Sequence, residues 1–346
     1  MQLRFSLDRE GEPVYSVNYG NKPVVLWSRL GFALSADSLF YKGFSLRGSE
    51  QRAVDDRWKP VWGEVAAIRD HYQQLTVHLQ KGGAAGLWLD IVFRVFEDGV
   101  GFRYVFPKQA GLTYFIVTDE RTEFHLAGDH KSFWIPGDYD TNEYPYTTSK
   151  LSEVDNRALV AASTAIAVRV APDPHAVQTP LMMKTADGLY LNIHEAGLAG
   201  YSAMQLHVDA GTLTLSASLV PDAVGNKAYL HAPAATPWRT IIVSDKAADI
   251  LASKMILNLN EPSKLTVTDW IHPMKFVGVW WEMQTGKGTW SYSDYADSVS
   301  AGGASIPNGR HSANTANVKR YIDFAAKNHI GGVLVEGWNV GWEDWF

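Results

Sequence analysis

The chain has 346 residues, a formal net charge of -6 and no cysteine, which excludes disulfide bonds and thiolate metal sites. Its acidic balance argues against nucleic-acid binding, and no apolar run is long enough to cross a membrane. A hydrophobic content of 46% allows a large core, and the length suits two domains. The 13 tryptophans favour a carbohydrate surface over a phosphate-binding one. The first residues lack the apolar segment of a secretion signal, so we expect any signal to have been removed.

Residues 2–243 show short alternating runs of apolar and polar residues, punctuated by turn residues. This pattern predicts about 15 strands in a large antiparallel sandwich. Alternation places Ile91, Phe93 and Val95 on one buried face. Two sequences, 97–99 and 186–188, are predicted to be hairpin turns in which glycine supplies a positive φ.

Two segments break the alternation. Residues 128–147 are aromatic and acidic and are predicted to form a functional or interdomain loop. Asp138, Asp140 and Glu143 have metal-like spacing there, but without the glycine and the terminal glutamate of an EF-hand a solvated loop is favoured. The second break is at residues 194–196, where Glu195 ends an otherwise apolar strand and His194 is expected to be a structural, hydrogen-bonded histidine.

The predicted domain organisation follows from the end of this pattern. Residues 237–243 are the last expected strand, and residues 247–258 are expected to form one short amphipathic helix. We therefore predict a β domain over 1–245, a linker with this helix over 246–270, and a different unit over 271–346.

The last unit contains two apolar runs, residues 276–281 and 332–335, each followed by a glutamate. They are predicted to be parallel strands buried on both faces. Between them, Val318, Tyr321, Ile322 and Ala325 form one apolar helical stripe, with Asn314 or Ser312 as the N-cap and an end near Gly331. A strand, a helix and a second parallel strand make a βαβ unit with a right-handed crossover.

Chemistry in such folds lies at the carboxyl ends of the strands, so Glu282 and Glu336 are expected to face a reaction site. Tryptophans gather in the same stretch and suit the stacking of sugar rings; they are Trp280, Trp281, Trp290, Trp338, Trp342 and Trp345. Two parallel strands cannot close a barrel, so we expect the chain to be a fragment of a longer enzyme whose remaining segments complete the fold.

Several stretches resemble glycoside hydrolase family 97, most closely its inverting α-glucosidase branch of the bacterial starch-utilisation type. They are residues 98–104 (DGVGFRY), 194–196 (HEA), 278–283 (GVWWEM), 285–288 (TGKG), 311–323 (HSANTANVKRYID), 333–339 (VLVEGWN) and 341–346 (GWEDWF). The resemblance implies a mainly β N-terminal super-sandwich, like that of galactose mutarotase, followed by the start of a (β/α)8 barrel.

The resemblance also implies an activity, a metal and a location. The intact enzyme is expected to be periplasmic, to use a calcium ion, and to hydrolyse α-linked gluco-oligosaccharides from one end with inversion. The catalytic glutamates of the family lie in later barrel strands, so no residue here is assigned as the general acid or base. Glu195 matches the calcium-ligating glutamate of the N-terminal domain. Substrate contacts are expected from four barrel-mouth residues, Lys287, Trp290, Glu336 and Trp338.

Three alternatives remain open at this stage. The first is the retaining α-galactosidase branch of the same family. The second is a non-catalytic domain that binds carbohydrate. The third is a sugar mutarotase, which would need paired histidines and a glutamate on one concave sheet face, and no such set can be placed in the sequence.

Overall fold

The computed structural model describes residues 1–83, 86–163, 169–289, 292–293, 304–312 and 314–335. The chain divides into two compact units, Met1–Pro262 and Ser263–Phe346, and each is described here by itself. Within the described ranges, no helix is both long and apolar enough to cross a membrane.

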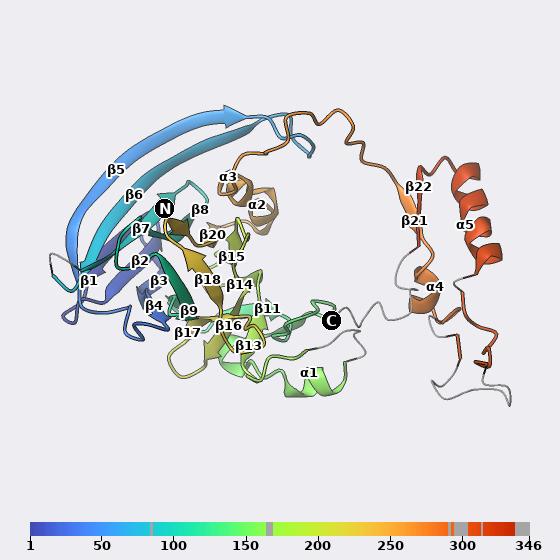
Figure 1. Ribbon diagram of the computed structural model, residues 1–346, viewed down its shortest axis with the longest axis horizontal. Helices are drawn as coiled ribbons and strands as arrows, with labels where there is room; N and C mark the ends of the chain where they lie inside the picture. Colours follow the sequence, from blue (N-terminus) through green and yellow to red (C-terminus); the bar gives the residue numbers. More distant parts are fainter. Residues whose placement is uncertain (84–85, 164–168, 290–291, 294–303, 313, 336–346) are drawn as a thin grey trace. The chain divides into compact units, whose positions relative to one another are not determined.

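The first unit is mainly β, as predicted, and is built around one large antiparallel sheet (Figure 1). Its strands, in spatial order, are β12 (Thr147–Lys150), β11 (Lys131–Trp134), β14 (Leu181–Lys184), β15 (Tyr190–Ala196), β20 (Trp238–Ser244), β8 (Gly99–Phe106), β7 (Leu87–Val95), β6 (Ile68–Lys81) and β5 (Phe44–Trp58), with β19 (Ala234–Ala235) beside β8. Figure 1 shows β5 and β6 as long, curved neighbours at one end of this sheet. The predicted last strand of the domain, β20, therefore lies in the middle of the sheet.

Smaller sheets face the large one. They consist of β1 (Gln2–Leu7), β2 (Pro13–Tyr19) and β3 (Lys22–Arg29); of β10 (Glu123–His125), β17 (Thr214–Leu219), β16 (Met204–Asp209) and β13 (Ala176–Gln178); and of β18 (Ala228–His231), β9 (Tyr114–Glu120) and β4 (Phe32–Leu34). The short helices η1 (Leu151–Glu153) and α1 (Arg157–Ala161) lie in the connection between β12 and β13. Strand β11 lies within residues 128–147, so the structure forms a strand in part of the segment predicted to be a loop.

The main core lies between the large sheet and the smaller ones. Ile91 and Phe93 of β7 are fully buried in it, as their alternation predicts, and Val95 packs at its edge. Rings from opposite layers touch, because Tyr15 of β2 lies 4.9 Å from Phe102 of β8 between ring centroids. Aromatic pairs of this kind add to the stabilisation that burial alone provides.

The turn at residues 97–99 joins β7 to β8 in an antiparallel hairpin, as predicted. The positive φ predicted for the glycine of this turn is wrong, since Gly99 does not have one. Gly188, in the other predicted turn, does have a positive φ. A Cβ on Gly99 would instead lie 2.5 Å from the carbonyl oxygen of Ile241. Close approach of the neighbouring strand therefore explains this glycine.

A second, smaller core covers the other face of the large sheet. Tyr72, Trp238 and Ile242 of the sheet pack there against Met255 and Leu259. The helix predicted over 247–258 is in fact two short helices, α2 (Ala247–Ala252) and α3 (Met255–Asn258). The helix breaks because Ser253 has an extended backbone, with φ -53° and ψ 135°.

The second unit contains the predicted parallel pair of strands, β21 (Phe276–Gly278) and β22 (Gly332–Leu334). The first strand is shorter than predicted, because Trp281–Gln284 form a helical turn, α4. The strands are not buried on both faces either, since Phe276 remains 56% exposed. Each strand is only three residues long, so the pair presents few side chains on either face of the sheet.

Helix α5 (Thr315–Lys327) connects α4 to β22. Its N-cap is Asn314, one of the two predicted, whose side chain accepts a hydrogen bond from Asn317 N over 2.9 Å. The helix ends earlier than expected, at Lys327, because Asn328 leaves the helical conformation and His329 has a positive φ. Of the predicted apolar stripe, Ala325 is buried but Ile322 stays exposed.

Candidate functional site

Glu195 lies on the inner face of strand β15. Leu191 and Ile193, four and two residues earlier, are fully buried on the same face, and alternation continues this row to Glu195. Arg239 of β20 is its direct partner in the strand register. The Arg239 guanidinium donates from Nη1 to Glu195 Oε2 over 2.6 Å. Glu195 Oε1 accepts from Met204 N over 3.0 Å, so both carboxylate oxygens are engaged.

A second carboxylate, Glu120 at the end of β9, binds the same guanidinium. Arg239 donates from Nε to Oε1 over 2.8 Å and from Nη2 to Oε2 over 2.7 Å, which makes a bidentate pair. The hydroxyls of Thr122 and Tyr201 also donate to Glu120, over 2.8 and 2.9 Å. Exposure is 0% for Arg239, 1% for Glu120 and 7% for Glu195, so the acid–arginine–acid cluster (Glu120, Arg239, Glu195) is buried.

The cluster holds two acidic groups and one basic group. Burial opposes ionisation of Glu120, but the charge and hydrogen bonds of Arg239, together with the hydrogen bonds from Thr122 and Tyr201, lower the pKa of that carboxyl. For Glu195, burial is the larger effect and raises the pKa, although Arg239 acts against it. The negative charge of Glu195 is therefore less fully compensated than that of Glu120.

The fit of a calcium ion depends on the number of oxygen ligands. Calcium takes six to eight oxygens, and a single carboxylate supplies at most two. Among the residues that the structure describes, no three His, Cys, Asp or Glu side chains are placed to hold a metal ion. The described part of the chain therefore supplies no cluster of acidic or histidine ligands around Glu195, and the role of Glu195 as a ligand stays a prediction.

Glu282, expected to face a reaction site, forms hydrogen bonds with helix α5 in the described structure. Its carboxylate accepts from Asn317 Nδ2 over 2.9 Å, from Arg320 Nη2 over 2.7 Å and from Tyr321 Oη over 3.1 Å. Burial works against ionisation, but hydrogen bonds from Ser312, Asn317 and Tyr321 and the charge of Arg320 lower the pKa of Glu282. These contacts make Glu282 the polar link between α4 and α5.

The structure describes one of the four predicted substrate contacts. Lys287 is exposed, and its backbone N donates to the Glu282 carbonyl oxygen over 2.8 Å. Trp290, Glu336 and Trp338 lie outside the described residues. The substrate role of all four residues stays a prediction.

Asp138 organises the aromatic and acidic loop of the first unit. Its Oδ1 accepts backbone N–H groups from Asp140, Thr141 and Arg169 over 2.9 to 3.2 Å. Its Oδ2 accepts from Tyr144 Oη over 2.9 Å, and burial together with this bond raises the pKa of Tyr144 to about 12. A carboxylate with these partners has a structural role. The solvated loop predicted for this position is wrong for Asp138, which is buried because it satisfies these backbone and hydroxyl donors.

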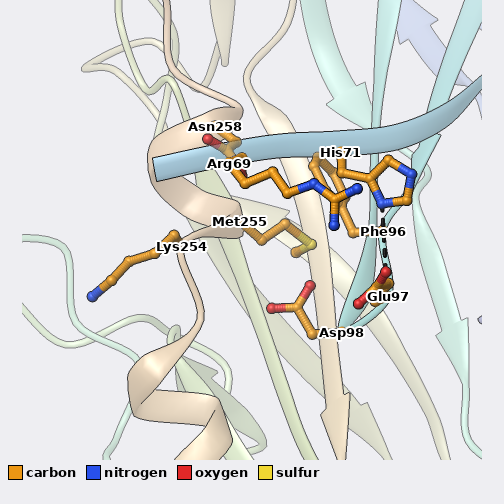
Figure 2. Close-up of a pocket in the computed structure, with 8 residues that line it drawn as sticks. All are labelled: Arg69, His71, Phe96, Glu97, Asp98, Lys254, Met255 and Asn258. Atoms are coloured by element: carbon orange, nitrogen blue, oxygen red, sulfur yellow. Dashed lines mark hydrogen bonds and ion pairs between the residues drawn. The ribbon is translucent and has the colours of Figure 1, made fainter. Parts of the chain in front are cut away.

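A pocket of about 270 Å³ lies beside helix α3 in the first unit. Figure 2 shows its lining, with Phe96 and Met255 as the apolar part and Arg69, His71, Glu97, Asp98, Lys254 and Asn258 as the polar part. The polar groups are largely paired with neighbours: Asp98 with Ser253 over 2.6 Å, and His71 with Glu97 over 3.4 Å. The pocket therefore presents few free groups that would bind a particular ligand.

Comparison with protein families covers nearly the whole chain. The model described as "Glycosyl-hydrolase 97 N-terminal" matches residues 1–262, and the model "Glycoside hydrolase 97" matches residues 280–346. The chain belongs to glycoside hydrolase family 97. The boundary of the first match coincides with the end of the first compact unit, Pro262.

Relatives within family 97 carry different names. The retaining alpha-galactosidase of Bacteroides thetaiotaomicron is 24% identical, over 94% of this chain and 47% of its own length. The probable retaining alpha-galactosidase of Streptomyces bingchenggensis is 28% identical, over 99% of this chain and 46% of its own length. A family 97 enzyme from Pseudoalteromonas sp. strain K8, solved with acarbose, is 35% identical with a TM-score of 0.81, over 99% of this chain and 47% of that one. The chain thus spans about half the length of these family 97 proteins.

Sequence reasoning identified Glu195 but missed the partners that hold it in place. Arg239 is the single charge in the strand β20, whereas Glu120 follows a second acid, Asp119, at the end of β9. A lone charge in an apolar strand needs a buried partner, and this signal could have found Arg239 but not Glu120. Their pairing could not be read directly, because 119 positions separate them in the chain.

Proposed function

We propose that this chain is part of an exo-acting α-glucosidase that hydrolyses α-linked gluco-oligosaccharides with inversion. The observation that carries the proposal is the 35% identity, over 99% of the chain, to the Pseudoalteromonas family 97 enzyme, which was solved with acarbose and also with panose. Both α-galactosidase relatives are more distant, at 24% and 28% identity.

Retaining α-galactosidase activity is the second candidate, because the two curated relatives bear that name. The two candidates differ in the stereochemistry of the first product, since an inverting enzyme releases the anomer opposite to that of the bond cleaved. Anomer-resolved NMR of the complete gene product acting on maltose should show β-glucose first. Release of the α-anomer from the cleaved bond would contradict inversion.

Calcium dependence is a further part of the proposal and rests on Glu195. Both oxygens of Glu195 accept hydrogen bonds, from Arg239 and Met204, so a calcium ion would have to share one of them and take its other oxygen ligands from elsewhere. A chelator should lower the unfolding temperature of the complete gene product, and added calcium should restore it. In Glu195→Gln this shift should shrink. An unfolding temperature that chelation leaves unchanged would remove the metal from the proposal.

Two remaining expectations belong to the same proposal. The parallel strands β21 and β22, joined through α5, suit the start of a (β/α)8 barrel, and the family 97 match over residues 280–346 supports this reading. The catalytic acid and base are not assigned to residues of this chain. A periplasmic location rests only on the resemblance to the starch-utilisation branch, and fractionation of expressing cells would test it.

A further inference from the structure

Three arginines gather on the face of the large sheet that carries the second core. Arg52 of β5, Gln74 of β6 and Arg94 of β7 are successive partners across the sheet. Arg52 and Arg94 both donate to Gln74 Oε1, over 3.0 and 3.1 Å. Arg103 of β8 and Arg94 both contact the ring of Trp238, at 4.5 and 4.8 Å from the guanidinium carbon to the ring centroid. These contacts place Arg52, Arg94 and Arg103, the arginine cluster, side by side.

The guanidinium of Arg94 is held in one orientation. It lies 4.5 Å from the Tyr72 ring centroid as well as against Trp238, and both rings are buried. Its Nε is fixed by Gln74. An arginine stacked on aromatic rings loses little conformational freedom when its outer nitrogens bind a ligand.

The positive charge of the cluster is incompletely compensated. Nη1 and Nη2 of Arg94 donate no hydrogen bond to any residue that the structure describes, and within the same ranges Arg103 Nε is buried without an acceptor. The carboxylate of Glu261 reaches Arg103 only at 3.4 Å from a mostly exposed position. Burial lowers the pKa of Arg94, and repulsion from Arg103 and Arg52 adds to this effect. Asp70 is near enough to attract Arg94 electrostatically but forms no hydrogen bond with it in the described structure.

We infer that the arginine cluster binds the carboxylate of an acidic sugar, such as a uronic acid residue, through the outer nitrogens of Arg94. A planar guanidinium with two free terminal nitrogens matches the two oxygens of a carboxylate. Three arginines on a chain of net charge -6 are too few for a nucleic-acid surface. We assign the carboxylate to a sugar because the chain belongs to a glycoside hydrolase family.

Calorimetry of the complete gene product with D-glucuronate, and with D-glucose as the neutral control, tests this site at low ionic strength. Glucuronate binding should depend on Arg94, whereas any glucose binding, which the proposed active site would itself provide, should be the same in wild type and in the Arg94 variants. Arg94→Met keeps an apolar side chain over Tyr72 but removes the guanidinium group. This substitution should weaken glucuronate binding by about tenfold or more. Arg94→Lys should weaken it as well, because an ammonium cannot form the bidentate pair.

Arg47→Met is the matched control, because Arg47 also stacks on a tryptophan, 4.3 Å from Trp88, but contacts none of the cluster in the described structure. Its glucuronate affinity should equal that of the wild type. Glucuronate affinity that Arg94→Met leaves unchanged, or an equal effect of the Arg47 and Arg94 variants, would overturn the inference. If glucuronate does not bind and Arg94→Met lowers the unfolding temperature, the partner is a carboxylate of the protein itself and the inference is also wrong. The comparison of the Arg94 and Arg47 variants with the wild type does not depend on which glycoside the enzyme hydrolyses, because neither residue is assigned to the active site.

Discussion

Arg239 and Glu195 face each other across strands β20 and β15, with 2.6 Å between Nη1 and Oε2. The same guanidinium binds Glu120 through its other two nitrogens, so one buried cation holds two buried anions. Removal of the cation would leave both carboxylates without their main partner.

Arg239→Met should therefore lower the free energy of unfolding by about 3–5 kcal/mol, the usual cost of breaking a buried ion pair from one side. Urea unfolding followed by tryptophan fluorescence measures this change. The control is Arg69→Met, which removes an exposed ion pair with Asp55 at 2.7 Å and should have a much smaller effect. Equal effects of the two substitutions would contradict the structural role of the buried cluster.

Asp138→Ala should destabilise the loop that follows β11. The substitution leaves three backbone N–H groups and the Tyr144 hydroxyl without their acceptor, at a cost of about 1–3 kcal/mol. Limited proteolysis should show faster cleavage between residues 135 and 147. Asp140→Ala serves as the control, because among the described residues the Asp140 carboxylate forms a single loose contact, with Arg169 at 3.9 Å. Similar cleavage rates in both variants would mean that Asp138 does not organise the loop.

Glu282→Gln should destabilise the contact between α4 and α5 in a pH-dependent manner. The folded pKa of Glu282 lies below its ordinary value of 4.5, so the charged form is the one that stabilises the fold. The difference in stability between wild type and variant should be fully present above pH 4.5, at about 1–3 kcal/mol, and should shrink as the pH falls through the folded pKa. Unfolding midpoints measured across this pH range test the sign. A difference that grows on acidification would contradict the assignment.

The sequence predicted strands well where one face is buried and the other is not. Ile91 and Phe93 alternate with polar residues and are buried as expected. Strand β5 shows no such alternation, because most of its residues are polar and it is exposed along nearly its whole length. Its existence depends on pairing with β6, from Phe44 opposite Lys81 to Trp58 opposite Ile68, which local sequence does not encode.

The candidate site was predictable only in part, for a related reason. Glu195 was found because an acid ends an apolar strand, but its partners come from β9 and β20 and are set by the packing of sheets. Glu282 was expected at a strand end, yet the strand stops at Gly278 and the following helical turn directs Glu282 toward Asn317 and Arg320. Local patterns thus identified which residues are unusual, whereas the tertiary fold determined what they contact.

The most direct test of the proposed function is the ratio of kcat/KM values of the complete gene product for 4-nitrophenyl α-D-glucopyranoside and the matching α-D-galactopyranoside. An active site that binds a sugar hydroxyl discriminates strongly against its epimer, so the glucoside should be favoured by more than about a hundredfold. A preference for the galactoside would contradict the α-glucosidase proposal and favour the α-galactosidase alternative.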